Sequence, residues 1–418
     1  MDAGTDLSPR GLARIVVDFM EALDLRDVTL VGNDTGGAIC QIVVAEYPKR
    51  IGRLVLTNCD AYEAFFPLVL RPLQCGARLF QEAGRQETTE SRASYFTESW
   101  EVISMSLHSI EPERATLHGQ FSPSLEPALT VDSGDTVSYS TLDVAWGIEN
   151  HKEGDLPRRK FGPRESPRDD GPCLVGPVAV RGAEPGSVLE VHVEAVEPGT
   201  WGWTVAGEIG FFNAELNRAL GVAEGPPRTT RWRIDTEAMV ARSHYGRSVR
   251  LRPFLGTIGL SPGRPGWHSA WPPGRTGGNL DCKELIAGST LYLPVAASGA
   301  LVSVGDGHAA QGDGEVSGTG IECPMERADL RYVVRNDLEL DAPRARTPGG
   351  WITFGFSEDL DEAATRALKD MLDLMARQFG LCRKDILALA SLVVDLRVTQ
   401  LVNGVCGVHA VLPHEAVQ

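Results

Sequence analysis

Residues 305–318 read GDGHAAQGDGEVSG and bring three carboxylates, a histidine and an amide together between closely spaced glycines. Asp306 and His308 are two residues apart, and so are Asp313 and Glu315, so each pair would point to one face of a strand. Histidine and carboxylates are ligands of divalent metals, so the spacing favours a metal or ligand site. The plainer interpretation is a tight turn at each Asp-Gly pair of the stretch.

The chain around this stretch has the pattern of a β-rich protein. Gly and Pro clusters separate segments that we predict as strands, which are 136–144, 187–196, 248–254, 290–295, 299–304, 330–340, 393–402 and 407–413. Helix is expected mainly near the end, where Ser357 is placed to cap a helix whose apolar residues run from Leu360 to Phe379 and stop at Gly380. The predicted fold class is α+β, mostly antiparallel sheet with C-terminal helices.

The N-terminal residues predict a separate, small α/β piece. Residues 28–33 and 53–58 have the composition of buried strands and flank a predicted helix, which implies a parallel pair. The turn GNDTG at 32–36 resembles the nucleophile elbow of α/β-hydrolases, with Asp34 where esterases carry serine. Aspartate at that position is the pattern of the dehalogenase and epoxide-hydrolase branch.

Residues 1–104 are expected to be a truncated and inactive fragment of such a hydrolase. The family takes an oxyanion donor from an earlier strand, and residues 65–104 look like only the start of a helical cap. Met105 opens a stretch that looks like a second protein start, as a gene fusion or a misplaced start codon would produce. The predicted domains are therefore 1–104 and 105–418.

Composition limits the partners and the compartment. The chain has 418 residues and a formal net charge of -16, which argues against binding a phosphate backbone. Its eight cysteines form no CxxC pair, the N-terminus is acidic and polar, and no apolar run approaches the roughly 18 residues of a membrane span. We expect a cytoplasmic protein that binds neither nucleic acid nor membrane.

From about residue 112 to the end, the sequence resembles the acetamidase/formamidase family. The matching motifs are GDTVSYSTLD (134–143), GPVAVRGAEPGSVLEV (176–191), WGW (201–203), GGNLDCKEL (277–285), the long segment 293–322 and SLVVDLRVTQLVNGVCGVHAVLP (391–413). The resemblance implies hydrolysis of the C–N bond in short linear amides, of the formamide or acetamide type, to a carboxylate and ammonia. A β-rich amidase of this kind is also expected to be a homo-oligomer.

An amide is a weak electrophile with a poor leaving group. Its hydrolysis needs an activated nucleophile, stabilisation of charge on the carbonyl oxygen and a proton for the departing nitrogen. Other amidases use cysteine with glutamate and lysine, or serines with lysine. No serine-glycine-rich run with a nearby lysine stands out, but Cys282-Lys283-Glu284 contains the residue types of the first set. Contiguous residues on a strand alternate between faces, however, so the three do not readily converge. Water activated by a divalent metal, zinc before calcium, is the remaining route.

Within the resemblance, four residues are predicted to hold the metal. His308, Asp143 and Asp281 are expected as ligands, and Asp306 as a ligand or as the partner of one. Asp143 and Asp281 lie inside motifs that match the family.

Four further residues are predicted to act on the substrate: Glu315, Asp313, Gln311 and Asn279. Glu315 is expected to take a proton from water and return it to ammonia. Gln311 and Asn279 are expected to donate hydrogen bonds to the amide oxygen.

Two other functions stay open at this point. One is an Asp34-dependent hydrolase of the dehalogenase or epoxide type, which would need a histidine base close to Asp34. The other is a non-catalytic β-domain whose closed ligand shell binds a metal or small ligand. The histidines at 192 and 409 are expected to be ordinary strand residues, and Trp201 and Trp203 to fill core.

Overall fold

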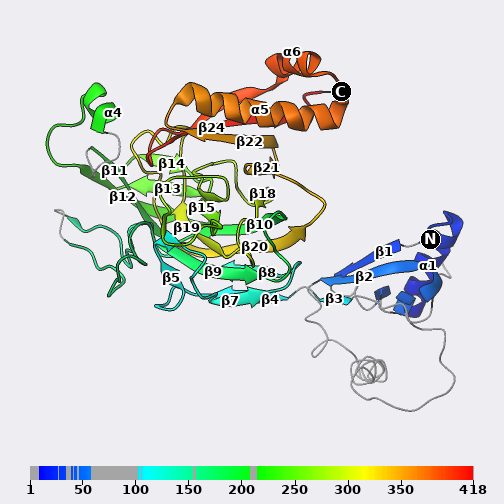
Figure 1. Ribbon diagram of the computed structural model, residues 1–418. Coiled ribbons are helices and arrows are strands. Elements are labelled where there is room, and N and C mark those ends of the chain that lie inside the picture. The colour runs from blue at the N-terminus through cyan, green and yellow to red at the C-terminus, as the bar shows by residue number, and fades with distance from the viewer. Residues whose placement is uncertain are drawn as a thin grey trace. The chain divides into compact units, whose positions relative to one another are not determined.

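The computed structural model describes residues 9–26, 28–33, 39–40, 42–44, 47–57, 102–104, 106–153, 157–207 and 214–417 (Figure 1). Contacts divide the chain into two compact units, Met1–Ser106 and Leu107–Gln418. In the described part of the chain, no helix is long and apolar enough to cross a membrane.

The first unit contains a three-stranded parallel sheet in the order β1-β2-β3. Its elements are α1 (Pro9–Ala22), β1 (Val28–Asn33), a 3-10 turn at Pro48–Arg50, β2 (Ile51–Thr57) and β3 (Val102–Ser104). Ala13 and Val17 of α1 pack with Val43, which gives this unit its own core. The predicted α/β fold is confirmed. Asp34 and residues 65–101 of the predicted cap lie outside the described residues.

The second unit is built around a nine-stranded sheet in the order β23-β24-β22-β21-β18-β10-β20-β8-β4. All neighbouring strands are antiparallel except β4 and β8. The strands are β4 (Leu107–Ile110), β8 (Thr136–Tyr139), β10 (Val188–Pro198), β18 (Thr290–Pro294), β20 (Met325–Arg335), β21 (Arg344–Thr347), β22 (Gly350–Ser357), β23 (Asp395–Gln400) and β24 (Cys406–Pro413).

A six-stranded sheet carries the order β17-β15-β19-β9-β5, with β7 paired to β9. Its strands are β5 (Leu117–His118), β7 (Leu129–Val131), β9 (Leu174–Val180), β15 (Phe254–Leu260), β17 (Gly277–Asn279) and β19 (Val302–His308). Every residue of β9, β15 and β19 is buried, as expected for strands covered on both faces.

Smaller sheets complete the unit, with β6 (Gln120–Phe121) paired to β16 (His268–Ser269), and β11 (Trp201–Ala206), β12 (Arg228–Asp235), β13 (Val240–Ser243) and β14 (Ser248–Arg250) in one sheet. One apolar cluster joins the two large sheets, because Leu189 of β10 and Tyr332 of β20 belong to the same core as Ile258 and Val304. The predicted β-rich, mostly antiparallel fold is therefore confirmed.

Three helices are described in this unit: α4 (Ala214–Ala219), α5 (Leu360–Phe379) and α6 (Arg383–Val393). Helix α5 lies along β22 and β24 (Figure 1), and its Ala363 and Met371 share a core with Val408. Its N-cap is Asp359, which accepts a hydrogen bond from the Glu362 N–H, so the prediction of Ser357 as the cap is wrong. Gly380 ends the helix with φ 66°, as its sequence position predicts.

His118 joins two strands of the six-stranded sheet through a neutral imidazole. Its Nδ1–H donates to the carbonyl of Gln120 (2.8 Å), and its Nε2 accepts from the Ser303 hydroxyl of β19 (2.9 Å). The ring is 1% exposed, and burial lowers its pKa to about 4. The folded protein therefore resists protonation of a histidine that the unfolded chain protonates near pH 6.5.

We expect the free energy of unfolding to decrease by about 3 kcal/mol as pH falls from 6.5 to 4 on account of His118 alone. The unfolded state binds the His118 proton more tightly than the folded state, so protonation favours unfolding. The contribution of the neutral imidazole to stability is therefore present above pH 6.5 and is lost as pH falls from 6.5 to 4. Denaturant unfolding of His118→Gln against the native chain, across this pH range, isolates the contribution. Curves with the same pH dependence would contradict it.

Candidate active site

The plainer interpretation of a turn at Asp306 does not hold, because the first half of the glycine-rich stretch belongs to strand β19. His308 pairs with Phe254 of β15, and Asp306 lies opposite Gly256 of the same strand. The side chains of Asp306 and His308 meet, with Oδ1 and Nε2 3.3 Å apart. Their spacing of two therefore places them together, as expected on a strand.

Four carboxylates and one imidazole gather around this end of β19, and we call them the acidic cluster: Asp281, Asp306, His308, Glu315 and Glu322. None of the five is more than 5% exposed. Ligand atoms of the first three lie within 4.8 Å of one another, and the same holds for the last three, so His308 belongs to both groups.

The backbone is strained where it presents three of these carboxylates. Asp281, Asp306 and Glu315 have φ values of 48°, 55° and 45°, a left-handed conformation that costs about 1–3 kcal/mol when a non-glycine residue must hold it. Gly256 lies beneath them, and a Cβ there would come within 2.5 Å of Asp306 Oδ2 and 2.6 Å of Asp281 Oδ1. The absence of a side chain at 256 thus lets the two carboxylates approach.

Amide side chains hold Asp281 in one orientation. Asn279 and Asn403 donate from Nδ2 to Asp281 Oδ2 at 3.0 and 2.8 Å, and Gln311 Nε2 donates to the Asp281 carbonyl at 2.8 Å. These contacts leave Asp281 Oδ1 without a hydrogen-bond partner among the residues that the structure describes. That oxygen is free to bind a cation.

Further buried atoms of the acidic cluster lack hydrogen-bond partners among the described residues: Glu315 Oε2, Glu322 Oε2 and both ring nitrogens of His308. His308 Nε2 lies 2.8 Å from Glu322 Oε1 without the geometry of a hydrogen bond. Unpaired buried polar atoms are costly, so several in one place call for a ligand. Carboxylate oxygens with an imidazole nitrogen form a donor set that suits zinc.

Burial perturbs the protonation of these groups. It raises the pKa of Glu315 to about 7 and that of Glu322 to about 8. Burial, together with the charge of Glu315, raises the pKa of Asp281 well above its usual range. Since crowded buried carboxylates resist ionisation, a divalent cation would be the largest local charge and would favour their ionised forms.

Asp143 does not join the acidic cluster, which corrects the prediction that it is a metal ligand. Its carboxylate is fully buried and accepts hydrogen bonds from Trp203 Nε1 (2.7 Å) and the backbone N–H of Gly147 (2.7 Å). It also pairs with the buried guanidinium of Arg158. These donors neutralise and occupy Asp143, so it organises the surrounding loop instead.

Two of the predicted catalytic residues have other roles in the structure. Asp313 turns toward Lys283, with Oδ2 and Nζ 2.9 Å apart, and its side chain remains 32% exposed. Asn279 is occupied at both ends, since Oδ1 accepts from Thr257 Oγ1 (2.5 Å) and Nδ2 bonds Asp281. Asp313 is therefore outside the cluster, and Asn279 orients Asp281.

Gln311 lies beside the cluster, but it offers a hydrogen-bond acceptor where the sequence predicted a donor. Its amide nitrogen donates to the Asp281 carbonyl, and its Oε1 is buried without a partner in the described ranges. The free atom is an acceptor, which suits the N–H of an amide better than its carbonyl oxygen.

Two residues of the site, Glu322 and Asn403, were not predicted from the sequence. Glu322 is positioned by backbone pairing with Trp203, with N···O distances of 2.8 and 2.9 Å. Asn403 comes from the loop after β23. Only these long-range contacts place the two residues beside Asp281 and His308.

A cavity of about 630 Å³ lies beside Asn403. It is lined by Ser269, Trp271, Pro272, Glu358 and residues 401–406. Asn403 is part of this lining and also donates to the Asp281 carboxylate, so it connects the cavity wall with the acidic cluster. A cavity next to perturbed carboxylates is a typical setting for an active site.

Comparison with known proteins gives two family matches. The model of the acetamidase/formamidase family matches residues 106–269 and 267–342, and that of the alpha/beta hydrolase fold matches residues 5–72. Both predicted resemblances are confirmed.

Individual relatives are distant in sequence. A protein assigned as a formamidase in Schizosaccharomyces pombe is 26% identical over 332 residues, covering 62% of this chain and 77% of that protein. An acetamidase of Mycolicibacterium smegmatis is 24% identical, and the match spans 48% of this chain and 61% of the relative. The crystal structure of an acetamidase from Bacillus halodurans superposes with a TM-score of 0.62 at 28% identity, covering 73% of this chain and 97% of that one.

Proposed function

Because the chain belongs to the acetamidase/formamidase family, we propose that it hydrolyses short linear amides to a carboxylate and ammonia at the acidic cluster. The reaction consumes one water, breaks the C–N bond and forms a C–O bond. The proposal assigns this chemistry to the unit Leu107–Gln418.

Asp281, Asp306, His308 and Glu322 are the proposed ligands of a divalent cation, with zinc favoured by the mixed oxygen and nitrogen donors. When bound, such a cation supplies the positive charge that lowers the pKa of water and polarises a carbonyl. The buried, partnerless oxygens of Asp281 and Glu322 are the observation that carries this assignment. Asn279 and Asn403 keep Asp281 oriented for that role.

Glu315 is the proposed proton carrier. Its Oε2 has no hydrogen-bond partner among the described residues, and burial raises its pKa to about 7, which suits a group that must both accept and release a proton near neutral pH. It would take a proton from water and deliver it to the departing nitrogen. Gln311 Oε1 is placed to accept a hydrogen bond from the substrate amide and so to orient that nitrogen.

The test is ammonia release from formamide, acetamide and propionamide by the full chain. We expect turnover that is lost on chelation and regained with a divalent ion, and that survives Asp34→Asn. Survival of activity in that variant separates the acidic cluster from an Asp34-dependent hydrolase. Absence of ammonia from all three amides, with the metal bound, would favour a non-catalytic ligand site.

A further inference from the structure

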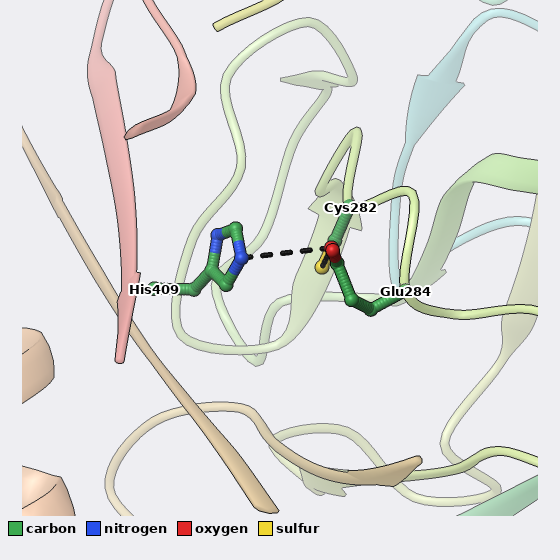
Figure 2. Close-up of side chains that lie close together, drawn as sticks. All are labelled: Cys282, Glu284 and His409. Carbon is green, nitrogen blue, oxygen red and sulfur yellow. Dashed lines mark hydrogen bonds and ion pairs between the residues drawn. The ribbon is translucent and has the colours of Figure 1, made fainter. Parts of the chain in front are cut away.

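A second group of side chains meets where the loop after β17 reaches strand β24 (Figure 2). Cys282 Sγ is 3.4 Å from Glu284 Oε2, and His409 Nε2 is 3.5 Å from the same oxygen. The three ligand atoms lie within 4.8 Å of one another. Cys282 and His409 are fully buried, and Glu284 is 6% exposed.

The His409 ring is held with one nitrogen free. Nδ1 is 2.7 Å from the Thr399 hydroxyl, which fixes the ring orientation. Nε2 points at Glu284 (Figure 2) but has no hydrogen-bond partner in the described part of the chain, although the residue is completely buried. An imidazole anchored through one nitrogen and unsatisfied at the other has the arrangement of a metal ligand.

Glu284 is fixed in a matching way. Arg397 donates to Glu284 Oε1 at 3.0 Å, which leaves Oε2 facing Cys282 and His409. Lys283, between the two loop residues, turns instead to Asp313 at 2.9 Å. Cys282 and Glu284 therefore share one face, and the lysine charge points elsewhere.

We propose that Cys282 Sγ, Glu284 Oε2 and His409 Nε2 bind a second divalent cation, separate from the acidic cluster. A thiolate, an imidazole and a carboxylate form a softer donor set than the acidic cluster, and this set selects zinc. Binding replaces the thiol proton, which is released to solvent.

The cation would fasten a loop that matters for catalysis. Cys282 directly follows Asp281 in the chain, whereas His409 belongs to β24 of the other large sheet. A bond between them through the metal would tie the backbone that presents Asp281 to a rigid strand. Cys282, Glu284 and His409 would then be positioning residues, because they would act on catalysis only through the placement of Asp281.

The test uses cobalt(II) loaded into the metal-free full chain. Cobalt bound to a thiolate gives a charge-transfer band in the near ultraviolet, and the acidic cluster contains no cysteine that could produce it. We expect this band in the native chain, its loss in Cys282→Ser with one ion fewer per chain, and its weakening in His409→Gln. Cys173→Ser, which changes another fully buried free cysteine, is expected to keep the band.

A native chain without the band, or a folded Cys282→Ser protein that retains it, would overturn the proposal. If the variants fail to fold, zinc-edge X-ray absorption of the native chain decides, because a sulfur neighbour at about 2.3 Å is required. Only oxygen and nitrogen neighbours would refute the site. Since neither readout uses amide turnover, this proposal and the proposed function can fail separately.

Discussion

Replacing Glu315 by glutamine is expected to reduce the rate of ammonia release about 100-fold to 10,000-fold, the usual contribution of a positioned acid-base group. Glutamine keeps the size of the side chain but cannot accept a proton at the buried position of Oε2. The bound metal is expected to remain, because Asp281, Asp306, His308 and Glu322 are intact. Steady-state turnover and metal content measured on the same sample check both parts.

Asp313→Asn is the matched control for Glu315→Gln. It makes the same chemical change two residues away, on a side chain that is 32% exposed and paired with Lys283. We expect its turnover to stay within about twofold of the native value, as for other surface substitutions. Loss of the metal in Glu315→Gln would make Glu315 a ligand, and unchanged turnover would remove it from the mechanism.

Gly256→Ala is expected to weaken metal binding about 5-fold to 150-fold, from an overpacking cost of about 1–3 kcal/mol. The new methyl group would lie 2.5 Å from Asp306 Oδ2 and 2.6 Å from Asp281 Oδ1, so the two carboxylates must separate. Isothermal titration of the metal-free protein with zinc measures the change.

Gly259→Ala, on the same strand, separates this effect from general destabilisation. Its methyl group would clash with Phe121 (2.5 Å) and the Gly278 backbone (2.8 Å), and none of the nearest atoms belongs to the acidic cluster. We expect a lower melting temperature in both variants but weaker metal binding only in Gly256→Ala. Equal metal affinities in the two folded proteins would show that Gly256 does not shape the site.

The rule that residues two apart point to the same face of a strand holds in the first half of the glycine-rich stretch and fails in the second. Asp306 and His308 lie on β19, and their side chains meet as the spacing of two predicts. Asp313 and Glu315 flank Gly314 (φ 93°) in a turn, so one side chain faces Lys283 and the other enters the cluster. Alternation of faces holds only where the backbone is extended.

Long-range contacts position the other residues of the site, and the spacing of residues along the chain does not predict such contacts. Glu322 is placed by pairing with Trp203, and Asn403 by the loop after β23. Asp143 was predicted as a ligand because it lies in a motif that resembles the family. In the structure its carboxylate is paired with Arg158 and accepts a hydrogen bond from Trp203 instead. Motif membership identified the region, but the tertiary partners determine each role.

The overall fold was more predictable than its individual strands. Alternating apolar residues and Gly-Pro turns indicated the antiparallel sheets, and helical spacing indicated α5 up to Gly380. Strands β9 and β15, which read LVGPVAV and FLGTIGL, were not predicted, because glycine and proline weaken strand propensity. One glycine of β15, Gly256, is needed at the site because it leaves space for the carboxylates of Asp306 and Asp281.

Anomalous X-ray diffraction at the zinc absorption edge, from crystals of the active, zinc-loaded full chain, shows whether the acidic cluster binds the metal. We expect a peak surrounded by Asp281, Asp306, His308 and Glu322, with Glu315 beside it. Active crystals that show no anomalous peak at these residues would contradict the claim that the acidic cluster is the metal-dependent amidase site.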